Sequence, residues 1–261
     1  MQEIVASFYD LGMLSKSQIG FIKSLHQKKY RKENGLFIVE GMKTLMEFFS
    51  SKYQIQSIYY LPQYQSLLPK LPSNIKLFEV NNAELEKIST LQAPQGILAL
   101  IAIPANEEVD PENLKHSFSL VLDGVQDPGN MGTIIRTADW FGFKHIICSA
   151  NTVEVFNPKT AQATMGSLAR VQVSYVNLTE YLPRVNVPLY AAMLDGESIF
   201  KVNWQQEGLI VLGNEGKGIS DEVAELVTRR ITIPRVGAAE SLNVSISAAI
   251  ICAEVSRNLY K

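Results

Sequence analysis

The second half of the sequence alternates short apolar runs with segments of helical spacing, and this pattern restricts the fold more than any other feature. The runs are rich in Val, Ile and Leu, so we expect strands. They are SLVLDG, HIICSA, VQVSYV, LYAAML, LIVLG and RITIP. We expect helices over Met131 to Phe141 and from Pro158 (capped by Asn157), Asp221 and Val244 onward. Such alternation predicts an α/β domain whose mostly parallel sheet is covered by helices.

The first half has a different pattern, which predicts a separate small α/β domain. Ser17 to Tyr30 has apolar residues at helical spacing and reads as an exposed basic helix. Strands are expected at GLFIVEG, IQSIYYL, IKLFEV and GILALIAI, and helices at KTLMEFFSS and AELEKIST. The polar, proline-bearing run PANEEVDPENLKHS follows and is the best linker candidate. We therefore expect domains at 1–105 and 106–261.

The composition is that of an ordinary globular protein, with 46% hydrophobic and 19% charged residues. The apolar stretches fall far short of a membrane span, and the N-terminus lacks the pattern of a secretory signal. We expect a cytoplasmic protein with no membrane contact. Cys148 and Cys252 both lie inside apolar strings, which favours reduced core thiols over a disulfide or a metal site. No metal is expected.

The net charge of −2 hides an asymmetry between the halves. Residues 1–105 hold 11 Lys and Arg against 8 Asp and Glu, a net charge of +3; the remainder holds 13 against 18, a net charge of −5. Lys23, Lys28, Lys29 and Arg31 lie in a stretch, residues 16–32, that contains no acid. Such a cluster is suited to phosphate groups of a nucleic acid. The alternative is a solvated basic helix face.

Ligands of parallel α/β sheets bind outside the carboxyl ends of strands, so the loops that leave the strands are the candidate site. Three of them are rich in Gly and small polar residues: DGVQDPGNMGTIIRTADWFG, GNEGKGIS and RVGAAESLNVS. In the first, Arg136 lies near the start of a helix, where the macrodipole disfavours a cation. It either pairs with Asp139 or Asp127, or its planar fork binds a phosphate or carboxylate.

The other two loops admit plain alternatives when taken singly. GNEGKGIS has the spacing of a P-loop between Gly213 and Gly218, but Ile219 and Ser220 follow where Lys and Ser or Thr are required, so a nucleotide triphosphatase is disfavoured. In the third loop, Ser241 or Asn243 could simply cap the helix that follows.

Taken together and in order, the three loops resemble the three motifs of the SpoU/TrmH RNA 2′-O-ribose methyltransferases, a branch of the SPOUT superfamily. The resemblance covers N-x-G-x-x-x-R-T-A from Asn130 to Ala138, L-G-N-E-x-x-G-I-S from Leu212 to Ser220, and I-P-x-x-x-x-x-E-S-L-N-V-S from Ile233 to Ser245. The N-terminal region, with KSLHQKKYRKENGLFIVEGMKTLMEFF and APQGILAL, resembles the L30e-like substrate-binding domain that many of these enzymes carry.

This resemblance implies a fold and an assembly that periodicity does not show. The C-terminal domain would contain a deep trefoil knot that forms the cofactor pocket, although knots are exceptions to ordinary chain topology. The protein would form a homodimer through this domain, use S-adenosylmethionine and act on RNA. An L30e-like domain points to ribosomal RNA before transfer RNA, and does so weakly because a fold does not identify a target.

The resemblance also implies roles for particular residues. Arg136 would activate the ribose 2′-hydroxyl. The other implied catalytic residues are Asn130, Glu215, Ser241 and Asn243, and the implied cofactor-binding residues are Leu212, Gly213, Asn214, Ile233 and Leu242. Because a guanidinium stays protonated in proteins, we assign Arg136 an electrostatic role toward developing alkoxide charge, with the proton leaving by another path.

Two other functions are weighed against ribose methylation. An RNA-binding protein that has lost catalysis is disfavoured because every motif position is filled. A base methyltransferase of the same superfamily fits the first motif, which contains Arg136, less well. A transfer RNA in place of ribosomal RNA is the alternative substrate.

The importance of the planar fork of Arg136 is testable by substitution. Arg136→Lys keeps the charge but not the fork, so we expect turnover to fall strongly while cofactor affinity stays unchanged. Single-turnover methylation and equilibrium cofactor binding measure the two quantities. Turnover close to that of the unaltered protein would mean that the fork is not essential.

Overall fold

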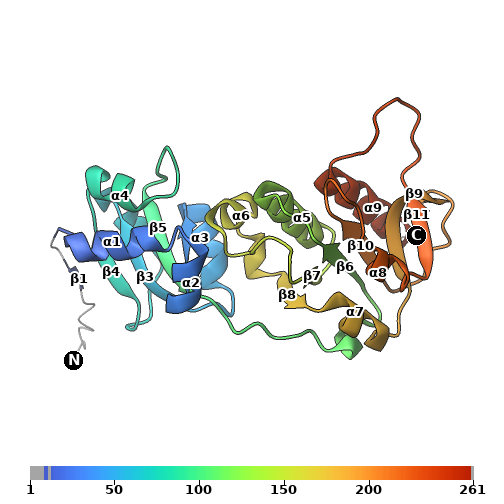
Figure 1. Ribbon diagram of the computed structural model, residues 1–261. Coiled ribbons are helices and arrows are strands. Elements are labelled where there is room, and N and C mark those ends of the chain that lie inside the picture. The colour runs from blue at the N-terminus through green and yellow to red at the C-terminus, as the bar shows by residue number, and fades with distance from the viewer. Residues whose placement is uncertain (1–8, 11–12, 260–261) are drawn as a thin grey trace. The chain divides into compact units, whose positions relative to one another are not determined.

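The computed structural model describes residues 9–10 and 13–259, which form two compact units (Figure 1). The first unit comprises the described residues up to Ala105 together with Phe156–Ala169. The second comprises Asn106–Val155 and the described residues from Arg170 onward. A single division of the sequence near residue 106 therefore misses one feature, because Phe156–Ala169 packs with the first unit.

The second unit is built on a six-stranded sheet of order β11-β9-β10-β6-β7-β8, in which every neighbouring pair is parallel. Its strands are β6 Phe118–Asp123, β7 His145–Ser149, β8 Gln172–Val176, β9 Leu189–Ser198, β10 Gly208–Gly213 and β11 Arg229–Thr232. The predicted parallel α/β sheet is thus confirmed. The trefoil knot stays a prediction.

Helices cover both faces of this sheet. They are α5 Pro128–Trp140, α7 Leu178–Tyr181, α8 Asp221–Ala224 and α9 Val244–Leu259. One face packs against α7 and α8 through Val121, Val211, Tyr181 and Val223. Helices α5 and α9 contact each other, and α9 contacts β10. The predicted start of α9 at Val244 is confirmed, whereas α5 begins at Pro128, three residues before its predicted start.

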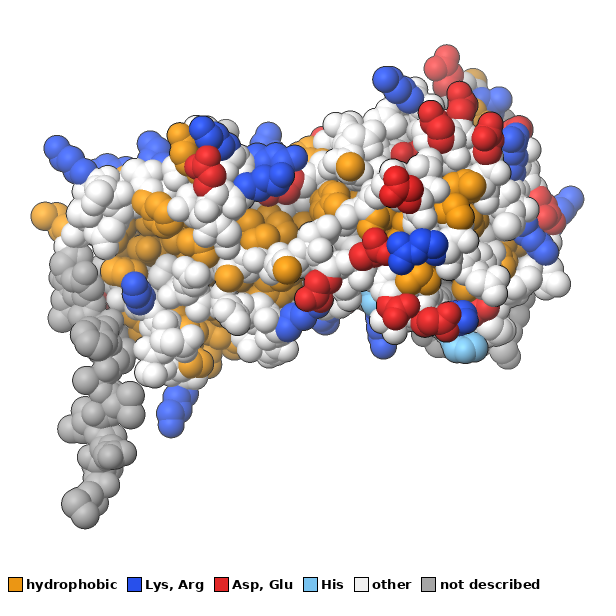
Figure 2. All heavy atoms as spheres, turned by 60° about the horizontal axis from the view of Figure 1, so that its bottom comes forward, with side chains coloured by type: hydrophobic (Ala, Val, Ile, Leu, Met, Phe, Trp, Pro, Cys, Tyr) orange, Lys and Arg blue, Asp and Glu red, His pale blue; other side chains and the backbone are white. Residues whose placement is uncertain are grey.

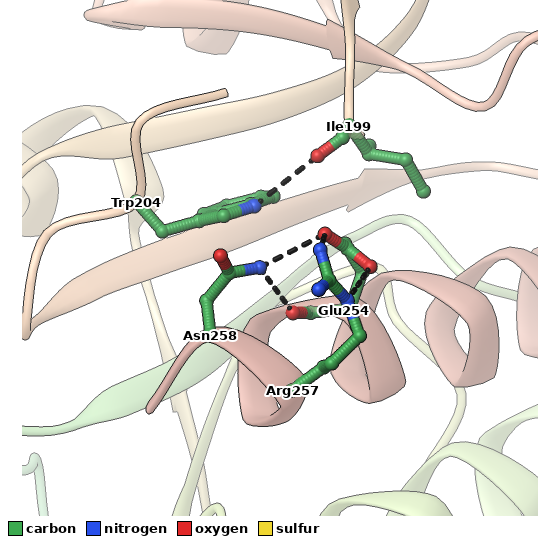
Figure 3. Close-up of polar contacts among 5 residues, drawn as sticks. All are labelled: Ile199, Trp204, Glu254, Arg257 and Asn258. Atoms are coloured by element: carbon green, nitrogen blue, oxygen red, sulfur yellow. Dashed lines mark hydrogen bonds and ion pairs between the residues drawn. The ribbon is translucent and has the colours of Figure 1, made fainter. Parts of the chain in front are cut away.

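The C-terminal end of α9 contains a group of polar contacts within the helix (Figure 3). Glu254 is buried and accepts hydrogen bonds from Arg257 Nε at 2.8 Å and Arg257 Nη2 at 2.6 Å. Asn258 Nδ2 donates to both the carbonyl and the carboxylate of Glu254. In the loop after β9, Trp204 Nε1 donates to the Ile199 carbonyl at 3.2 Å. The bonds to Glu254 neutralise a carboxylate that would otherwise be costly to bury.

The first unit contains a five-stranded mixed sheet of order β1-β4-β3-β5-β2. Its strands are β1 Tyr9–Asp10, β2 Leu36–Glu40, β3 Ile55–Tyr60, β4 Lys76–Glu79 and β5 Ile97–Ala102. Its helices are α1 Lys16–Ser24, α2 Lys28–Asn34, α3 Met42–Phe49, α4 Asn82–Ile88 and α6 Pro158–Ala163. The predicted small α/β unit is confirmed, and Asn157 caps α6 as predicted. Helix α6 contacts the edge strand β2 and thereby covers it.

The predicted basic helix from Ser17 to Tyr30 is wrong in one respect, because the chain turns between α1 and α2. Arg31 is only 1% exposed, and its Nη1 donates to the carbonyls of Leu25 and His26, each at 2.9 Å. These carbonyls at the end of α1 lack helical partners, and a cation there also favours the helix dipole. Arg31 therefore caps α1 and is not a surface contact for phosphate, which corrects its predicted role. Lys23, Lys28 and Lys29 are exposed.

Both cysteines are free and buried, as predicted. Burial raises the pKa of the Cys148 thiol far above its ordinary value and that of Cys252 to about 12. No helix in the described part of the chain is long and apolar enough to span a bilayer. Among the described residues, no three His, Cys, Asp or Glu side chains gather in a group suited to a metal ion.

The capping role of Arg31 predicts a large loss of stability on truncation. Arg31→Ala leaves two carbonyls without their donor and opens a cavity, so we expect the free energy of unfolding to fall by about 2–4 kcal/mol. Lys32→Ala on the exposed side of α2 is the matched control and should change it by less than about 0.5 kcal/mol. Urea denaturation measures both. Equal, small losses in the two variants would contradict the cap.

Candidate active site

Two of the three predicted loops leave adjacent strands at the same edge of the parallel sheet. β6 ends at Asp123 and β10 ends at Gly213, and these two residues are in register. Ser220, at the far end of the second loop, returns to this edge, where its backbone N–H and its hydroxyl each donate to Asp123 Oδ2 at 2.7 Å. The first two loops therefore lie side by side, as the strand-exit rule predicts.

Glu215 in the second loop binds the first loop through three hydrogen bonds. Its carboxylate accepts from the backbone N–H groups of Gln126 and Asp127, each at 3.1 Å, and from Asn130 Nδ2 at 3.0 Å. Charge-assisted hydrogen bonds of this kind are stronger than neutral ones. Glu215 thus fixes both the backbone of the first loop and the side chain of Asn130.

The surroundings of Glu215 alter its pKa in two opposing directions. Partial desolvation raises the pKa, whereas the hydrogen bonds from Asn130, Gln126 and Asp127 lower it. The hydrogen bonds together outweigh desolvation, and the pKa lies below its ordinary value of 4.5. Glu215 is therefore an anion at neutral pH and acts as an acceptor.

The start of α5 places Asn130 for this contact. Asp127 is the N-cap residue and accepts from the Asn130 backbone N–H at 2.8 Å, while Pro128 fills the first turn, where its missing N–H costs nothing. Asp127 thus caps α5, and Asn130 projects from the first turn of this helix toward Glu215. The cap at Asp127 was not predicted, although Asp followed by Pro before a helical pattern is its usual signal.

Asn243 joins the third loop to the other two. Its Nδ2 donates to Asn130 Oδ1 at 2.9 Å, and its Oδ1 accepts from the backbone N–H groups of Ser245 and Ile246 at 2.9 and 3.3 Å. Helix capping and participation in the site were alternatives in the sequence. In the structure the amide oxygen of Asn243 caps the helix, and its amide nitrogen donates to Asn130 in the site.

Asn214 connects the second loop to the first through hydrogen bonds. Its Nδ2 donates to the Gly124 carbonyl at 2.7 Å, and its Oδ1 accepts from the N–H groups of Gly216 and Lys217. Its backbone forms both hydrogen bonds of a bridge with Gly218. Asn214 therefore braces the turn against the first loop, and its predicted contact with the cofactor stays a prediction.

The remaining predicted cofactor residues line the same edge. A Cβ on Gly213 would lie 2.2 Å from the Gly218 backbone, so this close approach requires glycine. The Leu212 side chain is buried, which leaves only its backbone for a ligand; Ile233 is half-buried and Leu242 is 49% exposed. The last residues paired between β10 and β9 are Val211 and Ala191. Beyond Ala191, β9 next pairs at Glu197, and its partner there is β11. The backbone of Leu212 and Gly213 thus lies beyond the last β9–β10 pair.

Arg136 and Ser241 lie at exposed positions. Arg136 is on α5, about 9 Å farther along the helix axis than Asn130, given a rise of about 1.5 Å per residue. It shares an exposed stripe of α5 with Thr133 and Trp140.

A fourth loop, after β7, also reaches the site and was not predicted. Ser149 Oγ donates to Asn151 Oδ1 at 2.5 Å and accepts from the Gly124 N–H at 2.8 Å. Gln126 Nε2 donates to the carbonyls of both Gly124 and Asn151. A signal for it exists in the sequence, because HIICSA is also a predicted strand, but its exit loop lacks the glycines that mark the other three.

Comparison with known families and proteins gives matches to both halves of the chain. Residues 117–253 match the SpoU rRNA Methylase family, and residues 16–99 match the MRM3-like substrate binding domain. The chain is 30% identical over 234 residues to the 23S rRNA (guanosine(2553)-2′-O)-methyltransferase RlmP of Bacillus subtilis, with 88% of this chain and 92% of that protein covered.

Solved structures share the fold over nearly the whole chain. One from Porphyromonas gingivalis, described as an RNA methyltransferase of the TrmH family, has a TM-score of 0.87 at 39% identity and covers 95% of this chain and 100% of its own. The AdoMet-bound rRNA methyltransferase from Sinorhizobium meliloti has a TM-score of 0.85 at 28% identity and covers 95% and 98%.

The lowered pKa of Glu215 predicts a specific dependence of stability on pH. A carboxyl whose pKa is lower in the folded state stabilises the fold above its ordinary pKa, here 4.5, and this contribution is lost as pH falls through the folded value. We expect Glu215→Gln to destabilise the protein by about 1 kcal/mol at pH 7, since the site is exposed, and to remove this part of the pH dependence. Urea denaturation from pH 7 to pH 3 tests it, with exposed Glu225→Gln as the control. If the free energy of unfolding of Glu215→Gln differed from that of the unaltered protein by the same amount at every pH, the lowered pKa of Glu215 would be contradicted.

Proposed function

Because the chain belongs to the SpoU rRNA methylase family, we propose that it transfers a methyl group from S-adenosylmethionine to a ribose 2′-hydroxyl of ribosomal RNA. The observation that carries this proposal is the hydrogen-bonded chain from Glu215 through Asn130 to Asn243, which joins one residue from each of the three motif loops. Three polar residues separated by 85 and 113 positions meet at the carboxyl edge of the sheet.

The residues at this edge fit the proposed cofactor. Beyond the last β9–β10 pair, the backbone of Leu212 and Gly213 offers donors and acceptors for the edge of an adenine ring. Leu242, 49% exposed, and half-buried Ile233 offer apolar contact for the ring itself. Leu212, Gly213, Ile233 and Leu242 would therefore hold S-adenosylmethionine, which supplies a methyl group on a positively charged sulfur.

The chain's own residues position the ribose and stabilise charge. Asn130, held by Glu215 and Asn243, cannot rotate freely, so its loop presents a fixed polar surface to the nucleotide. Ser241 precedes Asn243 in the exposed loop and supplies a hydroxyl for the substrate. Arg136 places a permanent cation near the reacting oxygen, where it favours the developing alkoxide and binds the neighbouring phosphate.

The first unit is proposed to dock the RNA. With Phe156–Ala169 included, it holds 12 Lys and Arg against 8 Asp and Glu, and two of those acids, Glu40 and Glu84, are buried. Few carboxylates are visible on this unit in Figure 2. Exposed Lys23, Lys28 and Lys29 on α1 and α2 remain the candidates for phosphate contact.

We also propose a homodimer formed through the second unit. Helices α5 and α9, which pack together, carry the exposed apolar side chains Trp140, at 83%, and Ile246, at 50%. Exposed apolar groups on neighbouring helices favour a protein interface. A ribosomal RNA substrate would place the protein in the cytoplasm.

Incubation with labelled S-adenosylmethionine and ribosomal RNA from cells that lack the gene tests the reaction. Nucleoside analysis should find the label on ribose. A labelled base would indicate a base methyltransferase, and no label would indicate an RNA-binding protein without catalysis. Transfer RNA labelled in preference to ribosomal RNA would overturn the proposed substrate.

The basic helices predict the salt dependence of RNA binding. Replacing Lys23, Lys28 and Lys29 with Ala should weaken binding, and should lower the slope of log K against log salt by about 0.7–0.9 for each phosphate that is no longer neutralised. Cofactor affinity should not change. Filter binding at low and moderate salt measures the slope, with exposed Lys70→Ala as the control. An unchanged slope would contradict the docking role.

A further inference from the structure

Met165 holds an unfavourable backbone conformation in a turn between α6 and the short helix Ser167–Ala169. In the described part of the chain, two residues other than glycine have a positive φ, His116 at 59° and Met165 at 48°. Side chains with a Cβ are disfavoured in this left-handed region, and such residues gather at functional sites. Glycine or asparagine would fit the turn better than methionine.

The surrounding chain holds this turn in place. The Met165 N–H donates to the Gln162 carbonyl at 3.2 Å, and the Ser167 N–H donates to the Thr164 carbonyl at 3.1 Å. The next residue, Gly166, has a φ of 93°, and a Cβ there would lie 2.5 Å from Glu47 Cγ on α3. The turn therefore packs closely on α3.

The Met165 side chain contributes little to the core, because it is 54% exposed. Met46 on α3, the helix against which the turn packs, is 41% exposed. The same two helices carry exposed lysines, Lys43 on α3 and Lys159 on α6. The turn and α3 therefore present exposed apolar and basic side chains to the solvent.

The chemistry of this surface fits single-stranded RNA. The unit that carries it has a net charge of +4, from 12 Lys and Arg and 8 Asp and Glu. Figure 2 shows apolar side chains reaching the surface of this unit among its lysines and arginines. Unstacked bases of RNA pack on apolar or aromatic side chains, while lysines bind the backbone phosphates. A thioether is flexible and polarisable, which suits contact with different bases.

We propose that Met165 contacts an unpaired base of the RNA substrate, with Lys43 and Lys159 beside the backbone phosphates. The inference rests on the proposed function and adds a substrate contact outside the three motif loops. The turn lies within the stretch that matches the methylase family, yet it packs with the unit that contains the substrate-binding match. The turn therefore supplies a rigid apolar contact for the RNA on the first unit.

Met165→Gly separates this role from a structural one, because the two predict opposite changes in stability. Glycine removes the backbone strain together with the side chain, so the melting temperature should stay the same or rise by about 2 °C. Binding of ribosomal RNA from cells that lack the gene should weaken about fivefold, with a matching rise in KM and unchanged cofactor affinity. Met165→Leu keeps an apolar side chain and should restore most of the RNA affinity.

His116→Gly is the matched control, since His116 is the other strained residue and its N–H binds Glu207 at 2.6 Å. It should leave RNA affinity unchanged. Unaltered RNA binding in Met165→Gly, a fall in its melting temperature, or a change in its mass by analytical ultracentrifugation would each overturn the proposal, the last by indicating a protein partner. If the unaltered protein methylates ribose while Met165→Gly does so equally well, this inference alone fails.

Discussion

The arrangement of the candidate active site depends on one carboxylate, that of Glu215. Each loop leaves a different strand, so contacts between the loops are needed to fix their joint conformation. Three N–H groups donate hydrogen bonds to Glu215 and fix the first loop to the second. Asn130 also accepts a hydrogen bond from Asn243, which fixes the third loop to the other two. Because each member has a partner on another loop, the network selects one joint conformation of all three.

The same device recurs in the first unit, with different donors. Glu40 at the end of β2 is buried and accepts from the hydroxyls of Ser89 and Thr90 and from the Thr90 N–H. Glu84 accepts from the Leu14 and Asn81 N–H groups at 2.7 and 3.0 Å. In both units, therefore, these carboxylates accept hydrogen bonds from uncharged groups, mainly backbone N–H and hydroxyl groups. The hydrogen bonds organise loops at the ends of regular elements.

Local patterns in the sequence predicted most of the regular elements, because alternating apolar runs and capping residues such as Asn157 act over a few residues. They did not predict that Arg31 is buried, since a charged residue in a basic stretch looks the same whether it caps a helix or faces solvent. The packing of Phe156–Ala169 with the first unit depends on tertiary contacts alone. At the site, the resemblance identified Asn130, Glu215 and Asn243, but only the structure shows that Asn214 braces the turn and that Asn243 uses both ends of its amide.

The hydrogen bond between Asn130 and Asn243 spans 113 residues and has a consequence for how the protein is made. Contacts between distant positions form late in folding, because the closure entropy of the intervening chain must be overcome first. During synthesis the first two loops emerge well before Asn243, whose amide also caps α9. A nascent chain therefore lacks a complete hydrogen-bond network until α9 has left the ribosome, and a chain that stops before Asn243 lacks the residue that connects the third loop to the other two.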